Sequence, residues 1–384
     1  MVNKEYRIPC MILRGGTSKG LYFLDEDLPQ EQKVREQLLL KIMGSPDINQ
    51  IDGLGGGKSV TSKVAIVKVS EREDADVDYT FYQIAVDKAL VSAAGNCGNI
   101  SSGVGPFAIE KGLVKAREPI TAVRIYNTNT SKVIIEEVPC VNQSVKYDGE
   151  YAIAGVPGTA SPMKMRFCNP AGTLGENKSS GILPTGQAVD VLQIPDVGEL
   201  AVSIVDASNA LVFVRARDIG MRGDELPEEI DGNAEKLALL EKIRGVAAVR
   251  LGLCNDYREG EWKTPGIPKI VVVESSADCL STSGNVMKKD EFDIMARMMS
   301  MQKTHPSYAM TGAMCTAAAA VIPGTIVAQV LRDNIDEQCI RIGHPGGVLE
   351  VGVDFEINEN HAVIIKETFG FRTANLLMEG YVYS

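Results

Sequence analysis

Two stretches of the sequence decide the expected fold: Ala94-Gly-Asn-Cys-Gly-Asn-Ile-Ser-Ser-Gly-Val-Gly-Pro-Phe-Ala-Ile109 and Met310-Thr-Gly-Ala-Met-Cys-Thr-Ala-Ala-Ala-Ala-Val-Ile-Pro323. Each begins with a glycine-marked turn that carries a cysteine and continues into a run of Gly, Ala, Ser and Thr. Such small side chains let neighbouring backbone come close on every side. We therefore expect both stretches to form central helices enclosed by β-sheet, one in each of two similar domains.

The sequence around these helices is rich in strand signals. Eight short β-branched segments are bounded by Gly, Pro, Asn or Asp: Lys63–Val69, Tyr79–Val86, Thr121–Tyr126, Lys132–Val138, Leu200–Val205, Ala210–Ala216, Pro268–Glu274 and His361–Thr368. Helical spacing of apolar residues is found in three further segments, Glu31–Met43, Ala234–Val249 and Asp290–Met301. Strands and helices do not alternate regularly, so the pattern favours an α+β fold over a doubly wound sheet.

Length and charge restrict the domain number and the partners. The 384 residues predict two domains. We place the boundary at the end of a loop near residue 185, which gives an N-terminal domain of residues 1–185 and a C-terminal domain of residues 186–375. Thirty-nine Lys and Arg against 50 Asp and Glu give a net charge of −11, so no nucleic-acid partner is expected.

Neither a targeting signal nor a membrane segment is expected. The longest apolar stretch, Ala317–Leu331, is interrupted by Pro323 and Gly324 and is shorter than the ~20 residues that span a bilayer. The N-terminus lacks the apolar core of a signal peptide. We expect a cytoplasmic protein without a membrane partner.

The cysteines and histidines show no metal-binding pattern. Eight cysteines occur with no CxxC spacing, and the three histidines form no HxH or HxxxH pattern. The loop Gly53-Leu-Gly-Gly-Gly-Lys-Ser59 lacks the spacing of a Walker A loop and of a dinucleotide-binding fingerprint. Its exposed backbone N–H groups still suit an anion. Neither a metal site nor a nucleotide site is expected.

Lys63 and Cys97 are the candidate reactive residues. Lys63 begins a mostly apolar strand, where a lysine is either a surface residue with a buried stem or an amine beside a pocket. Cys97 precedes a helix that is expected to start near Asn99. The unpaired N–H groups at such a start favour a thiolate and can hold a substrate carboxylate.

The second half of the chain offers fewer reactive groups. Cys315 is expected about one turn inside its helix, so we interpret it as a buried structural thiol. The N–H groups of Thr311-Gly-Ala-Met314 can bind an anion, and His305 and His344 are candidates for ligand contact. Together these features suit a small anionic metabolite in a sheltered cleft, where attraction between charges is strong.

Seven motifs occur in order along the chain: Leu13-Arg-Gly-Gly-Thr-Ser-Lys-Gly20, Asp52-Gly-Leu-Gly-Gly56, Thr61-Ser-Lys63, Gly95-Asn-Cys-Gly-Asn99, Leu183-Pro-Thr-Gly186, Gly343-His-Pro345 and Leu377-Met-Glu-Gly380. Their combination resembles the 2-methylaconitate cis–trans isomerase family, which includes 3-methylitaconate Δ-isomerase and 4-oxalomesaconate tautomerase. The resemblance covers residues 8–382. It implies a diaminopimelate-epimerase-like fold, in which two domains each curl a β-sheet around a central helix. It also implies an active site between the domains and a C-terminal strand, residues 376–384, that returns to the first domain.

The resemblance also implies the chemistry. The family uses no cofactor; it removes a proton from a carbon beside an unsaturated carboxylate and returns one at the same carbon or two carbons away. Lys63 and Cys97 match the catalytic lysine and cysteine. Matching substrate-binding positions are Ser18, Thr61, Ser62, Gly98, Asn99, His305, Thr311, Gly312 and His344. A lysine accepts such a proton only where desolvation or a nearby cation, such as Lys58 or Arg14, stabilises its neutral amine.

The order of proton transfer and the substrate stay open. Either Lys63 or Cys97 can take the first proton, and one lysine moving both protons is an alternative. Two departures from the methylaconitate enzymes, Gly57-Lys-Ser-Val60 and His344-Pro-Gly-Gly347, favour 3-methylitaconate as substrate, converted to 2,3-dimethylmaleate by an allylic 1,3-shift. The alternatives are 2-methylaconitate cis–trans isomerisation and an oxalomesaconate-type tautomerisation, so the partner is a small di- or tricarboxylate.

Two other function classes compete with an isomerase. A cysteine hydrolase would pair Cys97 with His305 or His344, but it leaves Lys63 without a role. A carboxylate-binding protein without catalysis would keep the fold and bind the ligand. The sequence does not determine the oligomeric state, and a homo-oligomer stays open.

Overall fold

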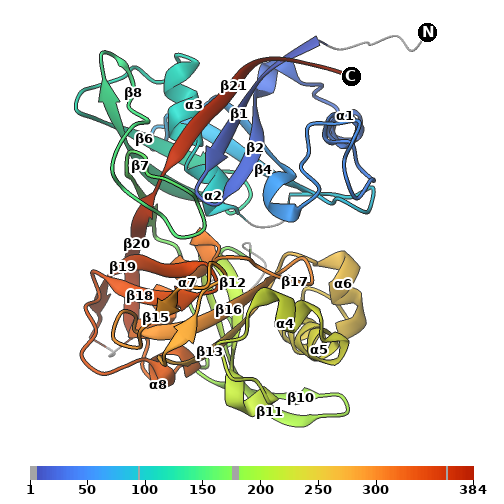
Figure 1. Cartoon of the computed structure of the whole chain (residues 1–384), viewed down its shortest axis with the longest axis vertical. Helices are drawn as coiled ribbons and strands as arrows, with labels where there is room; N and C mark the ends of the chain where they lie inside the picture. Colours follow the sequence, from blue (N-terminus) through green and yellow to red (C-terminus); the bar gives the residue numbers. More distant parts are fainter. Residues whose placement is uncertain (1–6, 94–95, 175–180, 360–361) are drawn as a thin grey trace. The chain divides into compact units, whose positions relative to one another are not determined.

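The chain divides into two compact units in the computed structural model, which describes residues 7–93, 96–174, 181–359 and 362–384 (Figure 1). Unit 1 comprises Met1–Arg166 and Phe371–Ser384, and unit 2 comprises Phe167–Gly370. The sequence placed the first boundary at residue 185. The structure places it earlier because the Thr173 amide donates to Asp206 Oδ2 at 2.7 Å and Ala171 forms a bridge with Ala207.

Unit 1 is a mixed sheet with helices on both faces. Its main strands are β1 (Arg7–Gly15), β2 (Ser18–Leu24), β3 (Lys63–Val69), β4 (Val77–Ile84), β6 (Ile120–Asn127), β7 (Lys132–Val141) and β21 (Ala374–Tyr383). They pair in the order β21-β1-β2-β3-β4-β6-β7, with β2–β3 and β4–β6 parallel and the other pairs antiparallel. The helices are α1 (Gln32–Met43), α2 (Gly98–Ser101) and α3 (Val104–Glu110). The C-terminal strand β21 thus lies in unit 1 beside β1.

Unit 2 repeats this arrangement. Its strands are β10 (Asp190–Ile194), β11 (Gly198–Ala207), β12 (Asn209–Arg215), β13 (Lys269–Ser275), β16 (Ile294–Ser300), β18 (Ile340–His344), β19 (Gly347–Ile357) and β20 (Val363–Arg372, whose end crosses into unit 1). They pair in that order, with β12–β13 and β16–β18 parallel and the others antiparallel. The longer helices are α5 (Ala234–Arg250) and α7 (Met310–Val321).

The two units share one order of elements along the chain. In unit 1, α1 separates the parallel pair β2–β3, and α2 and α3 separate the parallel pair β4–β6. In unit 2, α5 separates β12 from β13, and α7 separates β16 from β18. This repetition confirms the expectation of two similar domains that the two small-residue stretches suggested.

Three of the predicted helices are confirmed. The segment Glu31–Met43 forms α1, which ends at Gly44 in a left-handed conformation with φ 76°. The segment Ala234–Val249 forms α5, which begins where the Asn233 side chain accepts a hydrogen bond from the Lys236 amide. The second small-residue stretch forms α7.

The first small-residue stretch forms two short helices instead of one, and Ala94 and Gly95 at its start lie outside the described residues. The break between α2 and α3 follows from Pro106, which has no N–H to donate to Ser102 O and whose ring crowds that carbonyl. The small residues serve close packing, as expected. A Cβ at Gly103 would clash with the Tyr22 hydroxyl, and one at Gly105 would lie 2.6 Å from Glu136 Oε2.

The predicted helix Asp290–Met301 is wrong, because this segment contains β16. The strand lies between β13 and β18, and its first six residues are all buried. A strand that is buried on both faces carries apolar residues at every position, so it also satisfies the i, i+3, i+4 spacing of a helix.

Candidate active site

The predicted reactive residues of unit 1 share one face of its sheet. Val64 of β3 and Leu21 of β2 pack in the core that includes α1, so alternation turns Lys63, Ser18 and Gly20 to the opposite face. A Cβ at Gly20 would lie 2.9 Å from a side-chain carbon of α2 and from the carbonyl oxygen of Lys63. The helix α2 therefore packs against this face, which we call the inner face.

Lys63 is buried on the inner face, with 8% of its surface exposed. Its Nζ donates a hydrogen bond to Gln83 Oε1 at 2.7 Å and lies 5.1 Å from the centre of the Phe81 ring. Gln83 Nε2 donates to the carbonyl oxygens of Ser59 and Ser62, which orients the amide oxygen toward the amine. Within the described residues Lys63 forms no ion pair.

Cys97 is the residue directly before α2 and is partly exposed. Its side chain caps no amide, and the N–H groups of Gly98 and Asn99 belong to the first turn, where amides have no partner within the helix. After the larger effect of burial, a thiolate at Cys97 contributes to raising the pKa of Tyr22 and of Tyr79. The helix has four residues, so its free amides, rather than a long helix dipole, are what this position offers to an anion.

The turn between β1 and β2 lies against the start of α2. A Cβ at Gly15 would clash with Asn99 O, and a Cβ at Gly16 would clash with Asn99 Oδ1, so glycine is required at both positions. Asn99 Nδ2 donates to Thr17 Oγ1 at 3.0 Å. Ser18 Oγ is buried and has no hydrogen-bond partner among the described residues. This hydroxyl can therefore serve a ligand on the inner face.

Thr61 and Ser62 hold the glycine-rich loop in front of β3. Ser62 Oγ accepts from Gln50 Nε2 at 2.7 Å, and Thr61 Oγ1 donates to Lys58 O at 3.2 Å. The buried Gln50 also accepts from the Gly57 amide at 2.9 Å, so this amide of the expected anion site is already occupied. Sequence reasoning missed Gln50, because no local pattern marks a glutamine that joins three segments.

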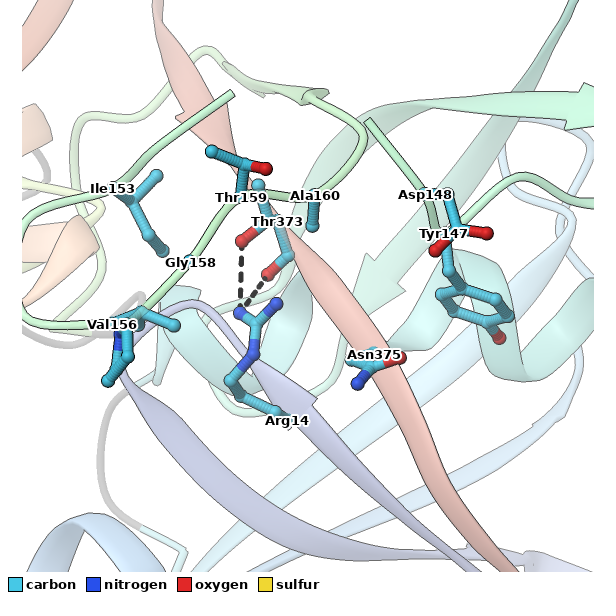
Figure 2. Close-up of a pocket in the computed structure, with 11 residues that line it drawn as sticks. Arg14, Tyr147, Asp148, Ile153, Val156, Gly158, Thr159, Ala160, Thr373 and Asn375 are labelled. Carbon is cyan, nitrogen blue, oxygen red and sulfur yellow. Dashed lines mark hydrogen bonds between the residues drawn. The ribbon is translucent and has the colours of Figure 1, made fainter. Parts of the chain in front are cut away.

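Arg14, one of the two expected cations, lines a cavity of about 140 Å³ together with Thr373 (Figure 2). Its Nη1 donates to Thr373 O, Thr373 Oγ1 and Gly16 O at 2.9–3.0 Å. Lys58, the other candidate cation, is exposed.

His305 and His344 lie on either side of Ser307 in unit 2. Nδ1 of His305 accepts from the Ser307 amide at 3.1 Å, and Nδ1 of His344 accepts from the Gly346 amide at 3.1 Å. A Cβ at Gly346 would lie 3.3 Å from His344 Cε1 and 3.4 Å from Ser307 Cβ. An N–H group at Nδ1 selects the tautomer with its proton on Nε2, so both rings can present a donor to an oxygen atom.

The helix α7 begins beside these histidines. The Tyr308 ring stacks on His344 with 6.4 Å between the ring centres, and its hydroxyl lies 2.9 Å from Thr316 Oγ1. Thr311 and Gly312 are buried in the first turn, where a Cβ at Gly312 would clash with Met298. The four predicted site residues of unit 2 thus gather at one end of α7.

Cys315 is a structural thiol, which confirms its interpretation from sequence. It is fully buried and donates to Val205 O at 3.4 Å. Burial raises the pKa of the Cys315 thiol, so the thiol form persists.

Sequence reasoning missed Asn209, which occupies in unit 2 the place of Ser18. Asn209 pairs with Ala207 across the β11–β12 turn, as Ser18 pairs with Gly15 across the β1–β2 turn. Asn209 is 1% exposed, and neither polar atom of its amide has a partner among the described residues. Asn209 is found only by comparing the strand pairing of the two units, and no sequence motif encodes that pairing.

The polar groups of both sites suit an anionic ligand. Across the described ranges, no group of three or more His, Cys, Asp and Glu side chains is placed to hold a metal ion. The donors are instead amides, hydroxyls, imidazoles and the Lys63 amine. Among the helices of the same ranges, none is long and apolar enough to cross a membrane.

The architecture defines the class: it is the fold of proline racemases and hydroxyproline epimerases. A solved hydroxyproline epimerase from Agrobacterium vitis superposes with a TM-score of 0.57 at 11% identity, over 99% of this chain and 93% of that one. A probable proline racemase from Agrobacterium radiobacter gives 0.55 at 13% identity, over 98% and 92%. These likenesses establish the diaminopimelate-epimerase-like α+β fold predicted from the motifs.

The chain belongs to the PrpF protein family, whose model matches residues 5–384. It is 46% identical to the 3-methylitaconate isomerase of Eubacterium barkeri, over all of this chain and 98% of that protein. It is 36% identical to the 2-methyl-aconitate isomerase of Shewanella oneidensis, over 98% and 97%. A solved methylitaconate-delta-isomerase is 47% identical with a TM-score of 0.80, over 98% and 95%. The predicted resemblance is confirmed, and the protein is an isomerase.

Proposed function

We propose that this isomerase interconverts 3-methylitaconate and 2,3-dimethylmaleate without a cofactor. The observation that carries the proposal is the 46% identity over the whole chain to a 3-methylitaconate isomerase. The inner face of unit 1 supports it with a buried amine, a thiol and an unpartnered hydroxyl around the start of α2.

The reaction moves one proton between two carbon atoms. A base removes the proton from the carbon that carries the methyl group and a carboxylate, and the electron pair of that C–H bond spreads over the neighbouring C=C bond. A proton then adds to the terminal methylene carbon, which becomes the second methyl group, and the double bond ends between the two carboxylate-bearing carbons. We assign these two transfers to Lys63 and Cys97, one on each carbon, with a single shuttling lysine as the alternative.

The intermediate carries an additional negative charge, which the site must stabilise. We assign this part to Ser18 Oγ, which has no partner among the described residues, and to the N–H groups of Gly98 and Asn99 in the first turn of α2. We assign Thr61 and Ser62 a supporting part through the loop that they hold against β3. Because the site is largely buried, each of these hydrogen bonds is worth more than it would be in water.

The gathered residues of unit 2 offer donors for a carboxylate. We propose that His305 and His344 present Nε2–H groups and that the first turn of α7, with Thr311 and Gly312, presents backbone N–H groups. N–H donors of this kind suit a carboxylate, which only accepts hydrogen bonds.

The test is an assay of the purified protein with 3-methylitaconate and with trans-2-methylaconitate, in which absorbance reports the conjugated product. We expect faster turnover of 3-methylitaconate, and faster turnover of methylaconitate would contradict the substrate assignment. A parallel reaction in deuterated water checks the mechanism, because two separate acid–base residues bring deuterium into the new methyl group, whereas a single shuttling lysine returns part of the original proton. Binding of both acids without any exchange of C–H protons would exclude catalysis.

A further inference from the structure

Arg372 is a buried arginine at the start of α2 that the motifs did not single out. It ends β20, lies within unit 1 and is 3% exposed. Its Nε donates to Asn99 Oδ1 at 3.1 Å, and its Nη1 donates to Phe371 O at 2.9 Å. A Cβ at Gly16 would come within 3.0 Å of Arg372 Cδ, so the missing side chain of Gly16 makes room for the arginine stem.

The charge of Arg372 has no counter-ion in the described part of the chain. No carboxylate there lies within ion-pairing distance of its guanidinium. Burial lowers the pKa of Arg372 to about 10, and the opposing effect comes from Tyr151, not from an acid. An unpaired buried charge costs several kcal/mol of stability. A buried arginine without a counter-ion in the protein is therefore expected to pair with the negative charge of a bound ligand.

A second buried arginine has different surroundings. Arg297 of unit 2 is fully buried, and its Nε donates to the backbone oxygen of Glu225 at 2.7 Å. Burial lowers the pKa of Arg297 as well, but Cys279, Asp224 and Glu225 act against that effect. Neither arginine forms an ion pair within the described residues, but acidic groups lie near Arg297, whereas none offsets the burial of Arg372.

One edge of the Arg372 guanidinium has no partner among the described residues. Its Nε and Nη1 are bonded within unit 1, and its Nη2 donates to no residue that the structure describes. The contact with Asn99 places this edge at the first turn of α2, two residues after Cys97. Asn99 in turn donates to Thr17, the neighbour of the unpartnered Ser18.

We propose that Arg372 is a substrate-binding residue, whose guanidinium pairs with one carboxylate of the dianionic substrate at the start of α2. Asn99 holds the guanidinium through Nε, and the carboxylate binds at the Nη2 edge. The planar fork of arginine suits this geometry. The assignment deepens the proposed function and rests on its substrate being a dicarboxylate.

The test compares two saturated ligands that cannot react, methylsuccinate and 2-methylbutanoate, which differ by one carboxylate. Their dissociation constants are measured by calorimetry or, for weak binding, by NMR titration. We expect Arg372→Met to weaken methylsuccinate binding by about 30-fold or more, the usual loss when a buried charge pair is truncated. The preference of the wild type for the dicarboxylate should fall to about threefold or less.

Matched variants separate charge from structure. Arg372→Lys keeps the charge and should retain most of the dicarboxylate preference, whereas Arg372→Gln keeps a donor for Asn99 and should lose it. Arg14→Met is the matched control, because Arg14 also donates to Thr373, next to Arg372. This variant should keep the preference for the dicarboxylate. Thermal unfolding checks that each variant is folded.

Two outcomes would overturn the assignment: an unchanged preference in both Arg372→Met and Arg372→Gln, or equal weakening of both ligands in these variants. The binding assay needs no turnover, so it is independent of the proposed reaction. A protein that does not isomerise 3-methylitaconate but loses its dicarboxylate preference in Arg372→Met would refute the reaction and keep the arginine assignment.

Discussion

The two small-residue segments occupy the same place in their units but differ in what they can do. In unit 1, α2 and α3 are short helices, and Cys97 lies directly before the first of them, partly exposed. In unit 2, α7 is one helix of 12 residues, and Cys315 is its sixth residue, fully buried. The same composition therefore serves close packing in both units, whereas only Cys97 lies at a helix start beside free amides, the position that we propose for a reactive thiol.

The difference between the segments has a cause in the sequence. Pro106 interrupts the hydrogen-bonding pattern of the first segment, and the amide of Gly105 beside it donates to Oε2 of the buried Glu136 at 2.8 Å. The run Ala317–Ala320 of the second segment has no such interruption and has high helix propensity. The first segment therefore forms two short helices, and the second forms one continuous helix.

The largest expected effect tests the two cysteines against each other. Cys97→Ala should lower turnover by about two orders of magnitude or more, the range of an acid–base residue. Cys315→Ala should keep turnover within about threefold and lower the free energy of unfolding by roughly 1 kcal/mol through the small cavity. Steady-state kinetics and denaturant unfolding of both variants measure this. Equal losses of turnover would remove the functional distinction between the segments.

Lys63 and Lys269, the first residues of the corresponding strands β3 and β13, allow a second comparison between the units. Lys63 begins β3 and donates to Gln83, and Lys269 begins β13 and donates to Gly266 O at 2.8 Å. Lys63→Met should lower turnover by about two orders of magnitude or more, and Lys269→Met should leave it within about threefold. A Lys63→Met enzyme with near-normal turnover would refute Lys63 as a base.

Substitution of Ser18 and of Asn209, the corresponding first residues of β2 and β12, should have a smaller effect on ligand binding. Because Ser18 Oγ has no partner among the described residues, Ser18→Ala should not lower the free energy of unfolding, yet it should raise KM or lower kcat by about tenfold through a lost hydrogen bond to the ligand. Asn209→Ala tests the corresponding place in unit 2 with the same two measurements. Loss of stability without any change in kinetics would mark either side chain as structural.

The smallest effect concerns the acid beside α3. Burial raises the pKa of Glu136 to about 8, above its usual value of 4.5. Between these two values the unfolded chain loses this proton and the folded chain keeps it, so stability falls as pH rises, by at most about 1.4 kcal/mol per pH unit. Glu136→Gln should remove this decline and make the protein more stable than wild type at pH 8. Parallel pH profiles of unfolding would contradict the assignment.

Local sequence patterns predicted most of the architecture. Apolar spacing predicted α1 and α5, and the small residues marked both central segments. The predicted helix Asp290–Met301 was wrong, because a strand that is buried on both faces also satisfies helical spacing. Local patterns also singled out Lys63 and Cys97 as candidate reactive residues, and the resemblance added Ser18; the structure places these three candidates on one face of unit 1.

Other parts of the site depend on contacts that no local pattern records. Gln50 joins its loop to β3 through one buried amide, and Asn209 is identified only by its position in the repeated strand order. Arg372 lies 273 positions from its partner Asn99. Such residues acquire their surroundings from tertiary structure, so composition and spacing do not reveal them.

The most direct measurement is a crystal structure of the protein with methylsuccinate bound. The account predicts that the two carbons corresponding to the reacting atoms lie within about 3–3.5 Å of Lys63 Nζ and Cys97 Sγ, with Ser18 Oγ donating to the ligand. If methylsuccinate binds beside Ser18 but either Lys63 Nζ or Cys97 Sγ lies too far from those two carbons, the assignment of proton transfer to this pair is contradicted.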